Sequence, residues 1–161
     1  MDGAHDLVHA TAIAAGDRAA LIRGPSGAGK SDLALRCLAQ PLSPLIARTS
    51  RLVADDRTIL TRRGAKIEVS SPETIRGLIE VRGLGVIRLP HEPDPVWLAL
   101  VVDLVAAQFF DRFPAEGSVA QLLGLPVGRI DLDPFEASAP LKLLLALERA
   151  LPMGVASTAS P

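Results

Sequence analysis

The segment at residues 24–31, Gly-Pro-Ser-Gly-Ala-Gly-Lys-Ser, constrains this chain more than any other part of it. It fits the pattern G-x-x-x-x-G-K-[ST] of a phosphate-binding loop. A short apolar run at residues 19–23 precedes it and predicts a strand, and the apolar spacing of residues 32–38 predicts a helix. A chance glycine-rich turn would not need this order of strand, loop and helix, so we interpret the segment as a site for a polyphosphate.

Each residue type in this loop has a chemical use. Glycines let backbone N–H groups turn inward onto a phosphate, and the start of the helix adds partial positive charge at the same point. Lys30 is expected to reach the β and γ phosphates, and the Ser31 hydroxyl to ligate Mg²⁺. The predicted phosphate-binding residues are therefore Gly24, Pro25, Ser26, Gly27, Ala28, Gly29, Lys30 and Ser31.

The composition indicates a soluble chain of ordinary charge. Its 161 residues fit one domain, expected over residues 1–150, with a mobile tail at residues 151–161 that has little to bury. Seventeen basic and eighteen acidic residues leave a formal charge of −1 without a basic block, so we expect no nucleic acid partner. We also expect no membrane partner, because no apolar stretch is long enough to span a bilayer. The lone Cys37 can form no internal disulfide, which suits a cytoplasmic location.

Two adjacent carboxylates, Asp55 and Asp56, follow a short apolar strand at residues 51–54. Phosphate-loop proteins commonly place an acidic residue at the end of a neighbouring strand, near the metal or the nucleophile. The alternative is a polar strand end that faces water. Two carboxylates beside a phosphate repel one another, which can make one of them a better proton acceptor. Asp103, at the end of an apolar run, competes with them for the position beside the metal.

The other elements follow from periodicity and turn residues. Residues 7–13 and 19–23 predict an antiparallel hairpin at the edge of the sheet, in which His9 is either a packing residue or a catalyst. We further predict a hairpin at residues 58–69, a short helix at 71–79, a buried central strand at 97–103 and a helix at 139–150. Residues 80–89 carry two closely spaced glycines between Glu80, Arg82 and Arg88, which fits either a backbone that passes close to a ligand or a β-bulge in a strand.

Three segments together resemble the catalytic domain of the HPr kinase/phosphorylase family. They are the phosphate loop, residues 52–57 (Leu-Val-Ala-Asp-Asp-Arg) and residues 80–87 (Glu-Val-Arg-Gly-Leu-Gly-Val-Ile), in this order. The matched motifs cover roughly residues 7–90. The chain resembles the short alphaproteobacterial form of the family, which lacks a separate N-terminal domain.

The resemblance implies a fold and an activity. The fold is an α/β domain with a mostly strand core around the phosphate-loop helix. The family uses ATP and Mg²⁺ to phosphorylate a seryl side chain of HPr, a phosphocarrier protein of the sugar phosphotransferase system. It also removes that phosphate with inorganic phosphate, releasing pyrophosphate. By analogy with the family's hexamer, a homo-oligomer is expected.

The resemblance also implies roles for individual residues. Asp55 takes the proton of the seryl hydroxyl and returns it in the reverse reaction, with Asp56 and His9 beside it. Lys30 holds the β phosphate, and Ser31 and Glu80 anchor Mg²⁺. The arginines expected to contact phosphate are Arg82 and Arg112.

Two other functions fit part of this pattern. One is a small-molecule kinase or an enzyme like phosphoenolpyruvate carboxykinase, and the other is a nucleotide-binding switch without transfer chemistry. The adjacent pair Asp55 and Asp56, together with the segment that begins at Glu80, favours the protein kinase over the first. A switch needs no base, so replacement of Asp55 would leave its activity intact.

Overall fold

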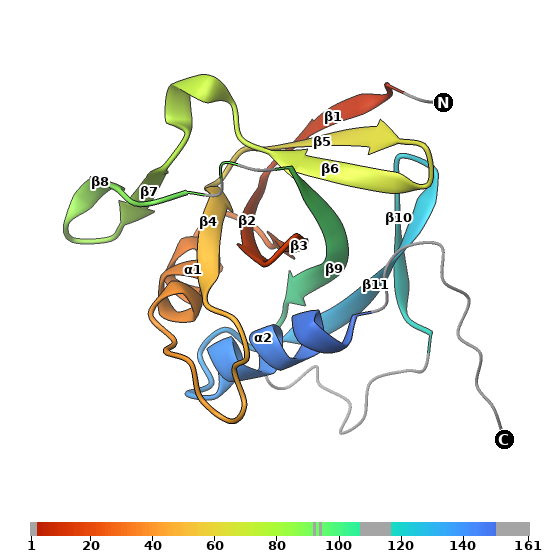
Figure 1. Ribbon diagram of the computed structural model, residues 1–161. Helices are drawn as coiled ribbons and strands as arrows, with labels where there is room; N and C mark the ends of the chain where they lie inside the picture. The colour runs from red at the N-terminus through yellow and green to blue at the C-terminus, as the bar shows by residue number, and fades with distance from the viewer. Residues whose placement is uncertain (1–2, 92, 94, 107–116, 151–161) are drawn as a thin grey trace, which may run out of the picture.

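The computed structural model describes residues 3–91, 93, 95–106 and 117–150, which form a curled sheet with two helices on one face (Figure 1). This is the predicted α/β class with a mostly strand core. The helices are α1 (Lys30–Leu38) and α2 (Ala139–Arg149), with a 3₁₀ turn η1 (Glu73–Ile75). The strands are β1 (His5–Val8), β2 (Ala10–Ala15), β3 (Arg18–Arg23), β4 (Ser50–Ala54), β5 (Thr58–Arg63), β6 (Lys66–Ser70), β7 (Leu78–Val81), β8 (Gly85–Arg88), β9 (Val96–Leu104), β10 (Val119–Leu122) and β11 (Leu125–Leu132).

The predicted buried strand β9 organises the main sheet. One of its edges pairs with β3 in parallel; the other pairs with β6 near its start and with β11, in parallel, near its end. The continuous order is β1-β5-β6-β9-β3-β2-β4. Because β3, β9 and β11 run in the same direction, their carboxyl ends meet at one edge of the sheet, where the phosphate loop begins.

The first predicted hairpin is present, but not at the edge of the sheet. Strands β2 and β3 pair antiparallel around Gly16, whose φ of 62° suits a glycine turn. Strand β2 lies between β3 and β4, so the edge position was wrong. Residues 10–14 are buried on both faces of β2, which suits an interior strand. The predicted strand also breaks at His9, and the piece before it, β1, pairs with β5 instead.

The predicted short helix is also shorter than expected. Only η1 is helical, and the chain then turns extended at Arg76 and left-handed at Gly77, whose φ is 75°. Leu78 and Ile79 instead lie in β7, which pairs with β8, and the fully buried Ile79 belongs to the apolar cluster that also holds α1. The other predicted hairpin, as β5 and β6, and the last predicted helix, as α2, are confirmed.

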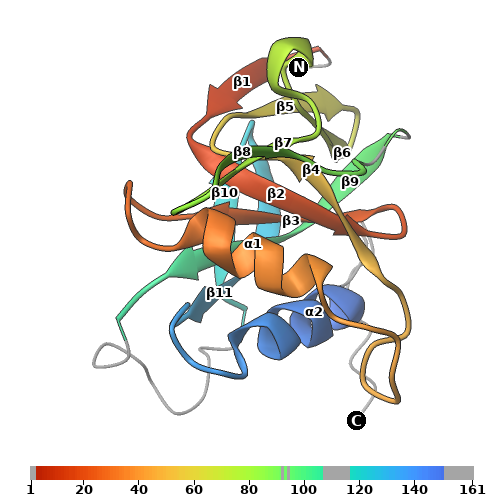
Figure 2. The same ribbon diagram turned by 90° about the vertical axis from the view of Figure 1, so that its left-hand side faces the viewer.

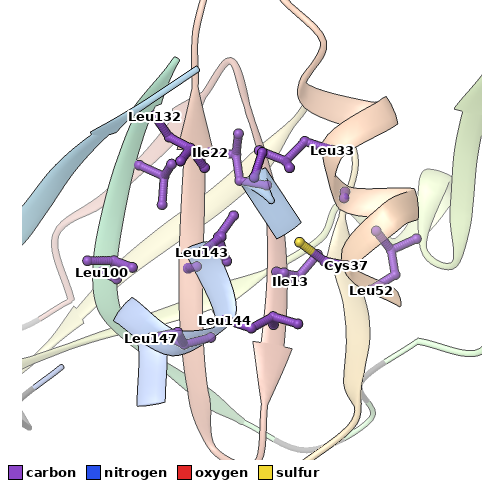
Figure 3. Packing of buried hydrophobic residues seen from close by; sticks show 14 of the residues in the cluster. Ile13, Ile22, Leu33, Cys37, Leu52, Leu100, Leu132, Leu143, Leu144 and Leu147 are labelled. Carbon is purple, nitrogen blue, oxygen red and sulfur yellow. The ribbon is translucent and has the colours of Figure 1, made fainter. Parts of the chain in front are cut away.

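Apolar side chains on the helix face of the sheet fix the position of α1. Leu33 and Cys37 of α1 pack with Leu143 and Leu147 of α2 over Ile13 and Ile22 of the sheet (Figure 3). Figure 2 shows the two helices side by side on this face. A second cluster fills the inside of the curl. The start of α1 is thereby held at the carboxyl edge of the sheet.

Some expectations concern residues that the structure does not describe. The segment with Asp111 and Arg112, and the predicted mobile tail at 151–161, lie outside the described residues. Within the part that is described, neither helix has the length and apolar character needed to cross a bilayer.

Burial of Cys37 generates a chemical prediction. Burial raises the pKa of this thiol to about 12, and the nearby positive charge of Arg36 lowers it by a smaller amount. Because the thiolate is the reactive form, we expect the native protein at pH 8 to resist a disulfide reagent and to react rapidly once denaturant unfolds it. Release of the reagent's chromophore measures both rates. Native labelling as fast as that of a free thiol would contradict this packing.

Candidate active site

The phosphate loop joins β3 to α1 in the predicted order. Gly27 and Gly29 have φ values of 81° and 99°, a region that favours glycine, and Gly29 is the N-cap of α1. The Ala28 N–H donates to the Pro25 carbonyl at 3.0 Å, which closes the turn. The backbone therefore has the tight, glycine-dependent turn into a helix start that suits an anion.

Lys30 lies across this loop. Its side chain is buried, and Nζ donates to the carbonyl oxygens of Gly24 at 2.7 Å and Pro25 at 3.0 Å. These bonds hold the ammonium group against the loop, at the position expected for a lysine that binds phosphate. The arrangement fits a polyphosphate ligand.

A buried carboxylate, Asp55, connects three elements beside the loop. Its Oδ1 accepts hydrogen bonds from Ser31 Oγ at 2.6 Å and Thr11 Oγ1 at 3.0 Å, and its Oδ2 accepts one from the Glu80 backbone N–H at 3.0 Å. Helix α1 and strands β2 and β7 thus converge on Asp55. Because Ser31 directly follows Lys30, the carboxylate lies next to the phosphate loop.

Thr11 was missed by the sequence analysis. Its hydroxyl donates to Asp55 and accepts the Asp56 N–H at 3.2 Å, so one side chain holds both acidic residues. It can do so because β2 lies next to β4, whose end carries the two acids. The available signal was a single polar residue in the alanine-rich run of residues 10–15.

Asp56 and His9 form the outer part of the site. His9 Nδ1 lies 3.2 Å from Asp56 Oδ1, and their side chains are 51% and 59% exposed. Asp56 has a φ of 66°, an uncommon conformation for a residue other than glycine. The left-handed backbone at Asp56 directs the two neighbouring side chains differently, so Asp55 is buried and Asp56 faces solvent.

The side chains of two other predicted residues, Glu80 and Arg82, point to solvent. Glu80 reaches Asp55 through its backbone N–H, while its side chain is exposed. Arg82 is exposed in the turn between β7 and β8, and the described contacts of Asp55 do not include it. The structure therefore brings together Lys30, Ser31, Asp55, Asp56 and His9.

Asp103 belongs to a separate ion pair. Its carboxylate accepts two hydrogen bonds from Arg23, at 2.7 and 2.9 Å, and lies 3.5 Å from Arg129 Nε. The hydrogen bond with Asp103 raises the pKa of Arg23, and partial burial opposes the shift. Neighbouring Val102 packs on the helix face, so alternation along β9 directs Asp103 away from α1. Among Asp55, Asp56 and Asp103, the three candidates for the acid beside the metal, Asp55 is therefore the one that contacts Ser31.

The bridging role of Thr11 generates a prediction. Thr11→Val keeps the shape of the side chain but removes the donor to Asp55 and the acceptor for Asp56, so the free energy of unfolding should fall by about 1–3 kcal/mol. Thr11→Ser keeps the hydroxyl and should recover most of that loss. Urea denaturation measures both variants. Equal stability of Thr11→Val and the unmodified chain would show that the bridge is not needed for folding.

Comparisons with known proteins place the chain among relatives of one family. The family described as HPr Serine kinase C-terminal domain matches residues 4–137. The HPr kinase/phosphorylase of Bordetella pertussis is 35% identical over 141 residues, which cover 81% of this chain and 42% of that protein. The HPr kinase/phosphorylase of Burkholderia cenocepacia is 32% identical over 140 residues, which cover 81% and 40%. The chain thus spans less than half the length of these curated relatives.

A solved structure shares the fold. The Hpr(Ser) kinase/phosphatase from Coxiella burnetii superimposes with a TM-score of 0.67 at 21% identity, over 88% of this chain and 93% of that one. The curled sheet and its two helices are therefore a fold already seen in a solved protein.

Proposed function

This chain belongs to the HPr serine kinase C-terminal domain family, and from that premise we propose that it uses ATP to phosphorylate a seryl side chain of an HPr-like phosphocarrier protein. The observation that carries the proposal is the hydrogen bond between Ser31 of the phosphate loop and the buried Asp55. A nucleotide loop and an acidic pair are thereby joined in one site. The names of the relatives support the same activity.

The residues at the site fit ATP and Mg²⁺. The backbone of the glycine turns and the Lys30 ammonium group suit the phosphates. The oxygens of Ser31 and Asp55 are the hard donors that Mg²⁺ prefers, and the Glu80 carboxylate is the further ligand we propose. When bound, Mg²⁺ neutralises charge on the phosphates during transfer.

We assign the proton transfer to Asp56 instead of Asp55, the residue for which the family resemblance implied this role. Asp55 is buried and already accepts three hydrogen bonds, whereas Asp56 faces solvent. A base must reach the hydroxyl it deprotonates, and a serine on another protein arrives from solvent. Asp56 accepts the seryl proton while His9 orients its carboxylate. Asp55 stays at the phosphate end beside Ser31.

The same groups serve the reverse reaction. An oxygen of inorganic phosphate forms a bond to the phosphorus of phosphoserine, and the bond from phosphorus to the serine oxygen breaks. The products are pyrophosphate and a seryl alkoxide. Protonated Asp56 returns its proton to that alkoxide, which restores the carboxylate and the hydroxyl.

A transfer assay tests the activity itself. With ATP labelled at the γ phosphate, Mg²⁺ and the HPr-like protein of the same genome, we expect label on a serine of that protein. Lys30→Ala should abolish transfer, because the phosphate charge then lacks its counterion. Labelling should also stop when the acceptor serine is replaced by alanine. Turnover of Lys30→Ala at the unmodified rate would contradict the proposed function.

A second experiment separates the two acids. Asp56→Asn should lower kcat in both directions by roughly 100-fold with little change in ATP affinity, the scale of a lost general base. Asp55→Asn should instead raise the Mg²⁺ concentration needed for activity. Rates measured against Mg²⁺ for both variants decide between them. If Asp55→Asn keeps the ordinary Mg²⁺ dependence and loses both reactions, Asp55 is the base.

A further inference from the structure

An exposed aromatic side chain, Phe135, borders the phosphate loop. Phe135 is 78% exposed, while Pro134 before it is buried. Burial of a phenyl ring is favourable, so an exposed ring is a candidate contact for a ligand or a partner. Because Phe135 lies next to the phosphate loop, a nucleotide bound in that loop is the candidate ligand.

The segment that carries the ring is firmly held. The buried Asp133 accepts the Phe135 N–H at 3.0 Å through its Oδ1. Arg36 of α1 donates to the Pro134 carbonyl oxygen. The peptide group that joins Pro134 to Phe135 is thereby held at its N–H by Asp133 and at its carbonyl oxygen by α1, the helix that follows the phosphate loop.

The ring lies close to the N-cap of that helix. A Cβ atom placed on Gly29 would lie 3.6 Å from Pro134 Cβ and 3.9 Å from Phe135 Cε1. The Phe135 ring therefore forms one wall of the loop that is proposed to hold the phosphates, at the end where α1 begins.

The acids and the ring lie on opposite sides of the loop. Strand β3 enters the loop; β2 and β4 on one side lead to Thr11 and Asp55, and β9 and β11 on the other lead to Phe135. Figure 2 shows the end of β4 and the β7–β8 hairpin above the start of α1, and the segment between β11 and α2 below it. A nucleotide bound with its terminal phosphate toward Asp55 would extend its base toward the Phe135 side of the loop.

We propose that Phe135 is the surface on which the base of the bound nucleotide stacks. This inference rests on the proposed function, since it needs ATP in the loop. Stacking of a base on an aromatic ring is tolerant of base identity, because every base has a π face. A phenyl ring offers no hydrogen bond, so this contact predicts similar gains for adenine and guanine nucleotides.

Binding of three ligands to the full chain tests the proposal. The ligands are ATP, GTP and inorganic tripolyphosphate, which has the phosphates without a base, and titration calorimetry gives each Kd. Phe135→Ala should weaken ATP and GTP by about tenfold, within the range for loss of one stacking contact, and leave tripolyphosphate unchanged. Phe135→Trp should keep both affinities. Leu42→Ala, which truncates another exposed apolar side chain, should change none.

The outcomes separate this inference from the proposed function. Equal ATP affinity for Phe135→Ala and the unmodified chain would overturn the stacking role. So would an equal loss for ATP and tripolyphosphate, because the ring would then act on the loop alone. If the unmodified chain binds neither ATP nor tripolyphosphate, or binds both without regard to Lys30→Ala, the proposed function itself fails.

Discussion

The hydrogen bonds to the Asp55 carboxylate are the interaction on which the rest of the site depends. A buried carboxylate is costly unless donors replace the water it has lost. Here the donors come from β2, α1 and β7, so these three elements must approach one another for Asp55 to be accommodated. The position of Ser31 beside the acid is therefore a consequence of folding, and needs no ligand to create it.

The elements that the sequence predicts best are those with a strong local signal. Strand β9 is a continuous apolar run, α2 has helical apolar spacing, and the phosphate loop has its motif. The place of β2 within the sheet was not predictable in this way. An alanine-rich run fits an edge or an interior strand equally, and the pairing with β4 depends on residues far away in the chain. The break at His9 also depends on distant residues, because β1 pairs with β5 and not with β3.

The site residues likewise differ in whether a local sequence pattern predicts them. Motifs predicted Lys30, Ser31 and the acidic pair as site residues, because those residues lie within short patterns. Thr11 is 44 residues from Asp55, and its role depends on the neighbouring positions of β2 and β4. The difference between Asp55 and Asp56 is a matter of backbone direction, since the left-handed Asp56 places one acid inside and the next outside. The sequence of two adjacent aspartates does not predict this left-handed conformation.

The contact of Lys30 with its own loop has a thermodynamic consequence. Because Nζ already donates to two carbonyl oxygens and is shielded from water, a phosphate bound here would exchange one set of oxygen acceptors for another. Much of the cost of removing water from the ammonium group is met during folding. Selectivity for phosphate would then come from charge, since a phosphate oxygen is a stronger acceptor than the neutral carbonyl it would replace. A neutral ligand of the same shape would gain almost nothing by that exchange.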